Sequence, residues 1–205
     1  LGAWVDMGSS PLRILDAGTG TGVIALMLAQ RAGNAVITGI DIDAESVSEA
    51  SGNFTASPWS GRLTAELKPL QEWTAETDLI ISNPPFFINS LKAPDDRRSA
   101  ARHTDTLTHS DLIQTAVRCL SPEGRLAVIY PSDEAGAFAG EALSAGLFPT
   151  RICHVFTKAG TYPKRFMMEI SRIKKEPLIE ELSIMRDGDY SAAYKAVTSD
   201  FYLKF

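Results

Sequence analysis

The chain has 205 residues, 44% of them hydrophobic and 22% charged, which is the balance of an ordinary globular protein and enough for one domain with a sizeable core. Its formal net charge of −5 argues against non-specific coating of nucleic acid, because such a coat needs a basic surface. The longest apolar runs fall far short of the roughly 20 residues of a membrane-spanning helix, so we expect no membrane association.

Strand-like apolar runs alternate with helical stretches, which predicts a mostly parallel sheet with helices on both faces. The expected strands are residues 12–17, 36–42, 63–67, 78–82, 125–130, 155–157, 166–172 and 178–185. The expected helices are residues 22–31, 44–54, 110–120 and 134–145, and a helix with an aromatic tail is expected over 191–205. Asp43 is expected to cap the second helix, and Ser110 or Thr108 the third. A long polar segment at 89–109 and turns at 122–124 and 159–161 complete the pattern.

The cysteines and histidines form no metal-binding pattern. Cys119 and Cys153 lie in apolar segments and are expected to be buried thiols in a reducing cytoplasm. His103, His109 and His154 are scattered, with no spacing that suits a metal ion. We therefore expect a cytoplasmic protein that binds no metal, and we favour a monomer.

A glycine-rich loop joins the first strand to the first helix. Residues 16–22 read Asp-Ala-Gly-Thr-Gly-Thr-Gly. Glycine lets the backbone turn sharply and approach a ligand, and the helix N-terminus behind it offers free N–H groups to a carboxylate. A dinucleotide-binding loop would place its third glycine at Val23, so this loop is of another type. The motif instead resembles the first motif of class I methyltransferases, which bind S-adenosylmethionine.

Asp41 ends the second strand, where a carboxylate can accept hydrogen bonds from both hydroxyls of a ribose. In class I methyltransferases an acidic residue commonly follows the third strand and meets the adenine amino group. Here residues 68–71 read Lys-Pro-Leu-Gln, so the resemblance leaves Leu70 and Gln71 to cover the adenine. The residues expected to bind the cofactor are Asp16, Gly18, Thr19, Gly20, Gly22, Asp41, Ile42, Leu70, Gln71 and Asn83.

The fourth strand ends on Asn83-Pro84-Pro85-Phe86, which we predict to be the catalytic motif. An amino group on an aromatic ring is a poor nucleophile because its lone pair is delocalised. Two acceptors on its N–H groups, the Asn83 side-chain oxygen and the Pro84 carbonyl, favour the pyramidal geometry that frees the lone pair. The prolines hold these acceptors rigidly, and Phe86 offers a face on which a base can stack. The alternative is a turn that happens to end a strand.

The (Asn/Asp)-Pro-Pro-(Tyr/Phe) methyltransferases act on adenine N6, cytosine N4, guanine N2 or a glutamine amide, and the motif alone does not choose among them. Other stretches resemble one family, the tRNA (adenine-N6)-methyltransferases that modify the adenosine beside the anticodon of a valine tRNA. The matching stretches are residues 1–4, 25–31, 57–59, 78–86, 190–194 and 201–203. This chain departs from the family at Phe86 and Phe87, where tyrosines are frequent, and in the missing acid near Pro69.

The resemblance implies a Rossmann-like class I methyltransferase fold in a single domain over residues 1–205. That fold has a mostly parallel seven-stranded sheet with an antiparallel closing strand and helices on both faces. It also implies S-adenosylmethionine as methyl donor and tRNA as partner. The family normally carries a further basic and aromatic N-terminal segment, which we expect to be missing ahead of Leu1.

Basic side chains that could hold RNA phosphates occur in two places. Those in the polar segment after the catalytic motif are Arg97, Arg98, Arg102 and His103. Those near the closing strands are Lys158, Lys164 and Arg165. A loop as long as the polar segment is more often functional than idle, although an ordinary solvated charged loop is the alternative.

Two other functions stay open from the sequence. The same chemistry could act on guanine N2 of ribosomal RNA or on a protein glutamine. A methyltransferase fold without turnover could instead serve as a binding module for RNA or protein. The intact Asp41 and Asn83 argue against that second alternative, whereas the missing acid near Pro69 favours it.

Overall fold

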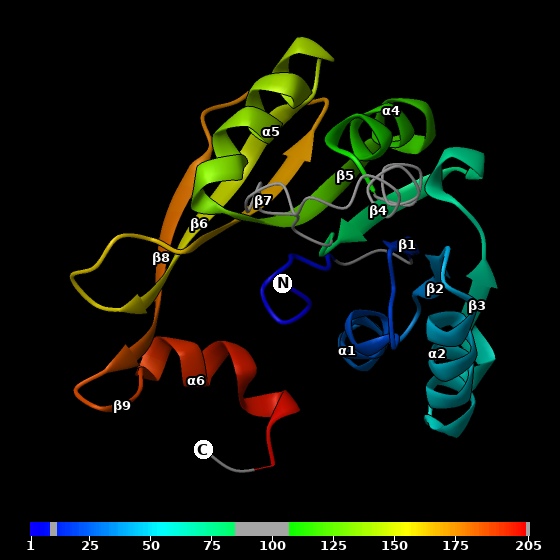
Figure 1. The fold of residues 1–205 in the computed structure, drawn as a ribbon, viewed down its shortest axis with the longest axis horizontal. Coiled ribbons are helices and arrows are strands. Elements are labelled where there is room, and N and C mark those ends of the chain that lie inside the picture. Colours follow the sequence, from blue (N-terminus) through cyan, green and yellow to red (C-terminus); the bar gives the residue numbers. More distant parts are fainter. Residues whose placement is uncertain (9–11, 85–106, 204–205) are drawn as a thin grey trace, which may run out of the picture.

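The computed structural model describes residues 1–8, 12–84 and 107–203 (Figure 1). These residues form a nine-stranded sheet in the order β3-β2-β1-β4-β5-β7-β6-β8-β9. The first five strands are parallel to one another: β1 (Arg13–Ala17), β2 (Val36–Asp41), β3 (Leu63–Leu67), β4 (Thr77–Ser82) and β5 (Leu120–Pro131). The other four are β6 (Phe148–Lys158), β7 (Arg165–Ser171), β8 (Leu178–Arg186) and β9 (Asp189–Tyr190).

The antiparallel closing strand is β7, which lies between β5 and β6 and runs opposite to both. Its direction confirms the predicted mostly parallel sheet with an antiparallel strand. The α-helices are α1 (Val23–Arg31), α2 (Ala44–Ala56), α4 (His109–Cys119), α5 (Ser132–Ser144) and α6 (Ala192–Thr198). The described residues also form three short 3-10 turns, η1 (Ser60–Arg62), η2 (Leu70–Glu72) and η3 (Ser199–Phe201).

Both faces of the central strands are apolar, because each face is covered by helices. Successive residues of a strand point to opposite faces, and here both members of such pairs are buried. Leu15 and Ile80 pack with Phe138 of α5 on one face, together with α4. Their neighbours Ile14, Leu79 and Ile81 pack on the other face in the cluster that contains Leu28 of α1 and Phe54 of α2. Figure 1 shows the two helical layers on opposite sides of the sheet.

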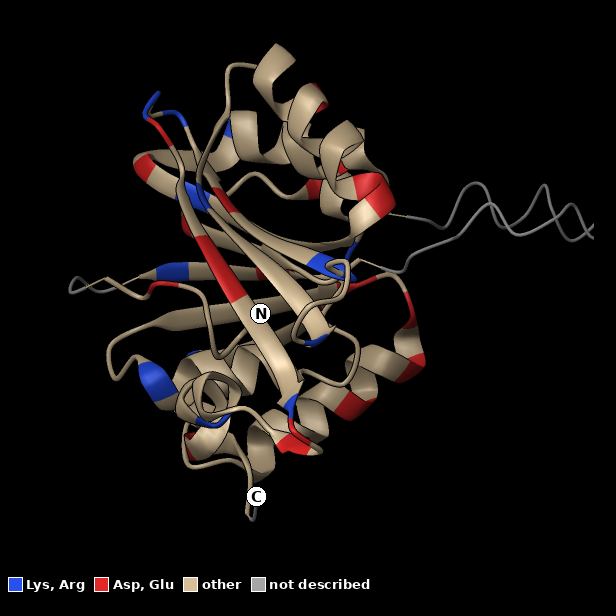
Figure 2. Cartoon of the chain, turned by 90° about the vertical axis from the view of Figure 1, so that its left-hand side faces the viewer, with Lys and Arg blue, Asp and Glu red and all other residues tan. Residues whose placement is uncertain are grey.

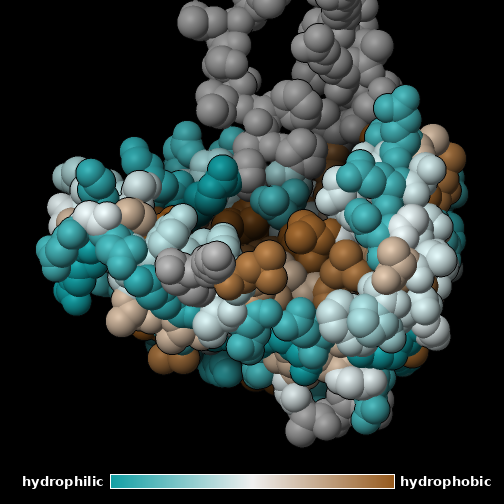
Figure 3. All heavy atoms as spheres, turned by 90° about the horizontal axis from the view of Figure 1, so that it is seen from below, coloured by the Kyte–Doolittle hydropathy of each residue, from teal (hydrophilic) through white to brown (hydrophobic). Residues whose placement is uncertain are grey.

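The face that carries α1, α2 and α6 also receives the N-terminal segment. Trp4 packs with Cys153 and Leu182, near α6. Figure 3, which views the molecule from below, shows hydrophobic side chains gathered near the centre of this face and hydrophilic ones around them. No helix among the described residues is long and apolar enough to cross a membrane.

Two predicted helix caps are resolved by their hydrogen bonds. Asp43 accepts a hydrogen bond from the Ser46 main chain at 2.8 Å, which confirms it as the cap of α2. Of the two candidates for α4, Thr108 is the cap. Its hydroxyl accepts from the Asp111 main chain, and the Asp111 carboxylate accepts from the Thr108 main chain in return.

The seven strands that the resemblance implies and the eight expected from the sequence pattern are both too few, since the described residues form nine. The strand predicted at 178–185 is confirmed as β8, which pairs in parallel with β6, and the two-residue β9 pairs with β8. An open edge of β6 would leave a row of main-chain groups unpaired, and β8 satisfies them. β6 itself starts at Phe148, well before the predicted 155–157, because Pro149 and Arg151 already pair with β7.

Two further predictions differ from the structure. The turn expected at 122–124 lies inside β5, where the pairing with β4 is irregular: Thr77 pairs with Leu120 but Leu79 pairs with Arg125, so β5 has three more residues than β4 over this stretch. In the segment 191–205, where a helix with an aromatic tail is expected, the α-helix ends at Thr198. The Thr198 hydroxyl donates to the main-chain oxygen of Tyr194 at 2.7 Å, a bond that competes with the helical pattern.

Candidate active site

The glycine loop and the first two residues of the predicted catalytic motif, Asn83 and Pro84, lie side by side at the carboxyl edge of the sheet. β1 and β4 are parallel neighbours, with Asp16 opposite Ile81. Gly18 and Asn83 each follow two residues later at the same edge. The hydroxyl of Ser82, which is fully buried, donates to the Ala17 main-chain oxygen at 2.7 Å. This bond fixes the position of one strand end against the other, so the structure brings the two predicted motifs together.

The glycine loop itself is held by main-chain hydrogen bonds. Gly18 N and Thr19 N both donate to the Ile40 main-chain oxygen at 2.9 Å. Gly18, Gly20 and Gly22 all have positive φ. The closest packing is at Gly22, where an added Cβ would lie 2.4 Å from the Phe54 ring. The loop therefore needs glycine at this position for both its backbone conformation and its packing.

Asp16 is buried beneath the loop, 1% exposed. Its Oδ2 accepts hydrogen bonds from the Thr19 hydroxyl at 2.8 Å and from Ala25 N at 3.2 Å. Its Oδ1 is buried without a partner among the residues that the structure describes. The Thr19 side chain also points inward, since a Cβ on Gly39 would lie 2.6 Å from its hydroxyl. A ligand would therefore meet Thr19 through its main chain.

Burial raises the pKa of the Asp16 carboxyl to about 6, against the opposing effect of its two hydrogen bonds. An unfolded aspartate has a pKa near 4, so the folded protein holds this proton more tightly. The resulting stabilisation is complete below about pH 4 and is lost as pH rises through about 6, a change of about 3 kcal/mol. Asparagine does not titrate, so we expect the free energy of unfolding of Asp16→Asn not to fall in this way as pH rises.

The measurement is urea unfolding of the wild type and Asp16→Asn between pH 4 and 7.5. Exposed Asp200→Asn serves as the control and is expected to follow the wild type. A difference between wild type and Asp16→Asn that stays constant over this range would contradict the prediction.

Asp41 lies at the end of β2 and contacts the same loop. One carboxylate oxygen accepts from Gly20 N at 2.9 Å and the other from Asp43 N at 3.1 Å. The next residue, Ile42, is 48% exposed. An acid that both holds the loop and faces the carboxyl edge suits the predicted contact with a ribose.

The two residues predicted to cover an adenine lie in η2. Leu70 is buried, and its side chain belongs to the core cluster on the α4 and α5 face. Gln71 is exposed, and its main-chain oxygen accepts from Arg118 at 3.3 Å. Of these two side chains, Gln71 is the accessible one.

The described chain continues past Asn83 as far as Pro84; Asn83 is exposed and Pro84 is buried. It returns at Leu107, whose Cδ2 atom lies 3.8 Å from the position that a Cβ on Gly18 would take. Both described ends are therefore near the glycine loop. The other predicted site residues of this region lie outside the described residues: Pro85, Phe86, Arg97, Arg98, Arg102 and His103.

Lys164 and Arg165 are at the same edge of the sheet. β7 is antiparallel, so its first residues lie where the parallel strands end, and Arg165 pairs with Pro131 at the end of β5. Lys164 N donates to the Val155 main-chain oxygen at 2.8 Å. One strand, β5, separates these residues from β4 and Asn83.

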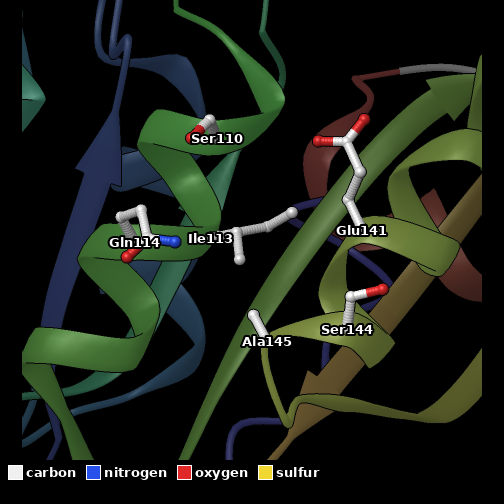
Figure 4. A pocket seen from close by; sticks show the side chains of 6 residues that line it. All are labelled: Ser110, Ile113, Gln114, Glu141, Ser144 and Ala145. Atoms are coloured by element: carbon white, nitrogen blue, oxygen red, sulfur yellow. The ribbon is translucent and has the colours of Figure 1, made fainter.

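A cavity of about 310 Å³ lies elsewhere, between α4 and α5 (Figure 4). Its lining residues are Ser110, Ile113, Gln114, Glu141, Ser144 and Ala145. None of them is a predicted site residue. Within the described ranges, no group of three or more His, Cys, Asp or Glu side chains could hold a metal ion.

Sequence reasoning missed two residues that position the site, Ser82 and Leu107. Ser82 carries a weak signal, because a hydroxyl that ends an otherwise apolar strand needs a hydrogen-bond partner when it is buried. Leu107 carries no sequence signal. Its position near Gly18 depends on where the chain returns to the sheet.

A mostly parallel sheet with a glycine loop after β1, an acid after β2 and Asn-Pro-Pro after β4 defines a class I methyltransferase. A family model for the methyltransferase small domain matches residues 7–138. A tRNA1(Val) (adenine(37)-N6)-methyltransferase of Phocaeicola vulgatus is 44% identical over 99% of this chain and 87% of that protein. A protein of the same name from Trichodesmium erythraeum is 43% identical over 100% of this chain and 88% of that protein. The chain belongs to the tRNA1(Val) (adenine(37)-N6)-methyltransferase family.

Solved structures agree with the fold. A crystal structure of a predicted O-methyltransferase from Agrobacterium tumefaciens has a TM-score of 0.73 at 17% identity, covering 97% of this chain and 94% of that one. A ribosomal protein L11 methylase from Lactobacillus delbrueckii has a TM-score of 0.59 at 18% identity, covering 84% of this chain and 75% of that one. At these identities the likeness shows the fold alone, and it confirms the predicted Rossmann-like methyltransferase architecture.

Proposed function

We propose that this protein transfers a methyl group from S-adenosylmethionine to N6 of adenine 37 in a valine tRNA, in the cytoplasm. The observation that carries the proposal is the placement of Asn83 beside the glycine loop, fixed by the bond between Ser82 and Ala17. The names of the relatives favour adenine N6 over guanine N2 or a glutamine amide.

The residues at the glycine loop fit S-adenosylmethionine. This molecule carries positive charge on its ammonium and sulfonium groups, and Asp16 offers a buried carboxylate oxygen that has no other partner among the described residues. We propose that Asp41 and Ile42 contact its adenosine, with Gly18, Gly20, Gly22 and the Thr19 main chain forming the loop around it. Gln71 is proposed to cover the adenine, and Leu70 to support Gln71 from the core. When bound, the cofactor supplies an electrophilic methyl group.

The acceptor side of the site is proposed to orient an exocyclic amine. The Asn83 amide oxygen and the Pro84 carbonyl would accept its two N–H groups, while Pro85 stiffens the motif and Phe86 stacks on the ring. The nitrogen loses its extra proton after transfer, so this chemistry needs no strong general base. Arg97, Arg98, Arg102, His103, Lys164 and Arg165 are proposed to hold RNA phosphates.

The test is methylation of an unmodified valine tRNA transcript, followed by nuclease digestion and mass spectrometry. We expect N6-methyladenosine at position 37 and no product on a transcript that carries guanine there. Separately, saturating S-adenosylmethionine at about 100 times its Kd should add about 2.7 kcal/mol of stability, or roughly 5–11 °C in Tm.

The outcomes separate the alternatives. A thermal shift without N6-methyladenosine would overturn the tRNA adenine assignment and favour another acceptor or a binding module. The absence of any thermal shift would overturn the cofactor assignment.

A further inference from the structure

We propose that the hairpin between β6 and β7 (residues 158–165, the β6–β7 hairpin) is a second RNA-binding element that contacts the tRNA outside the reacting nucleotide. It would stack a base on Tyr162 and hold phosphates with Lys158 and Lys164. The inference rests on the proposed function and extends it to how the substrate is held.

The hairpin lies at the carboxyl edge of the sheet, on the same side as the catalytic motif. Arg165 pairs with Pro131, and Ser82 pairs with Val128 of the same strand. The base of the hairpin is therefore two strand spacings from β4, ~10 Å across the sheet, and three residues, ~10 Å, further along it. This separation suits nucleotides near the target adenine but not the adenine itself. The hairpin projects at the left of Figure 1, and Figure 2 views the molecule from that side.

Hydrogen bonds fix the hairpin to the start of α5. Ser132 N donates to the Lys164 main-chain oxygen at 3.2 Å, and the Ser132 hydroxyl donates to the Pro163 main-chain oxygen. Within the turn, the Thr161 hydroxyl donates to the Lys158 main-chain oxygen at 2.7 Å. A hairpin held in this way loses little conformational entropy when it binds a partner.

The hairpin carries an accessible aromatic ring and two accessible lysines. Tyr162 is 89% exposed, the most of any aromatic residue that the structure describes. It therefore does little for the core. Lys158 and Lys164 are exposed, and neither forms an ion pair with any carboxylate of the described chain.

One exposed aromatic ring between two lysines fits single-stranded RNA. Unpaired bases stack on aromatic side chains, and lysines follow the phosphates. The protein is acidic overall, with a net charge of −5, so it needs local basic elements to hold a polyanion. A basic hairpin at the catalytic edge supplies one.

The test compares Tyr162→Ala and the double variant Lys158→Ala/Lys164→Ala with the wild-type protein on unmodified valine tRNA. We expect Tyr162→Ala to weaken tRNA binding and raise KM roughly tenfold, with kcat and S-adenosylmethionine affinity nearly unchanged. Tyr162→Phe should stay near wild type, because it keeps the ring. The double variant should reduce the slope of log K against log salt by about 1.4, the value for two contacts to single-stranded RNA.

The matched control is Lys174→Ala/Lys175→Ala, which removes two exposed lysines between β7 and β8, at the opposite edge of the sheet. It should leave KM unchanged. Equal effects of the two double variants, or a wild-type KM for Tyr162→Ala, would overturn the role of the hairpin while methylation by the wild-type protein still supports the proposed function. Failure of the wild-type protein to methylate tRNA would instead overturn the proposed function.

Discussion

Replacing Asn83 with alanine is expected to lower kcat for methyl transfer by roughly 10²–10³-fold, the usual loss when one preorganised hydrogen-bonding group is removed from a transition state. Asn83 is exposed at the end of β4, so the substitution leaves the core intact. Asn83 is also among the residues predicted to contact the cofactor, but the affinity for S-adenosylmethionine should stay within about twofold of wild type, because the glycine loop is held by Asp16 and Asp41. Single-turnover methylation and a thermal shift with the cofactor measure the two effects separately.

Two further variants test whether the effect comes from the acceptor oxygen of Asn83. Asn83→Asp keeps an acceptor oxygen at the same place and should retain more activity than Asn83→Ala. Asn34→Ala removes an exposed asparagine between α1 and β2, at the other edge of the sheet, and should behave as wild type. An equal loss of cofactor binding and methyl transfer in Asn83→Ala would mean that Asn83 supports the structure of the site.

Much of the central sheet follows from local pattern. The strand predicted at 63–67 matches β3 residue for residue, and Asp43 caps α2 as predicted. Both rest on signals within a few residues: an apolar run between turns, and a capping carboxylate before a helix. Parallel order also follows, because strands that alternate with helices are joined by crossovers.

What the sequence did not reveal depends on contacts between distant segments. The pairing of β8 with β6 joins residues on either side of β7, and no local pattern specifies a ninth strand as short as β9. The same holds in the site. Asp41 was predicted as a ribose contact, but its bond to Gly20 N, which ties the second strand to the glycine loop, becomes visible only when β1 and β2 lie side by side.

The glycine loop is also where a single methyl group should have the largest effect on stability. We expect Gly22→Ala to lower the free energy of unfolding by about 2–5 kcal/mol. A left-handed backbone costs an L-residue about 1–2 kcal/mol, and Gly22 has a φ of 80°. The new Cβ would also lie 2.4 Å from the ring of Phe54, and such overpacking costs about 1–3 kcal/mol.

Relief of this clash would require Phe54 to move, and Phe54 is 2% exposed in the core between α1 and α2. The N-terminus of α1 would shift with it, so binding of S-adenosylmethionine should weaken as well. The matched control is Gly136→Ala in α5, where an added Cβ meets nothing within 4 Å and φ is not positive. That variant should gain up to about 1 kcal/mol, because alanine favours a helix. Urea unfolding compares the two, and a loss below 1 kcal/mol for Gly22→Ala would contradict both the backbone cost and the clash with Phe54.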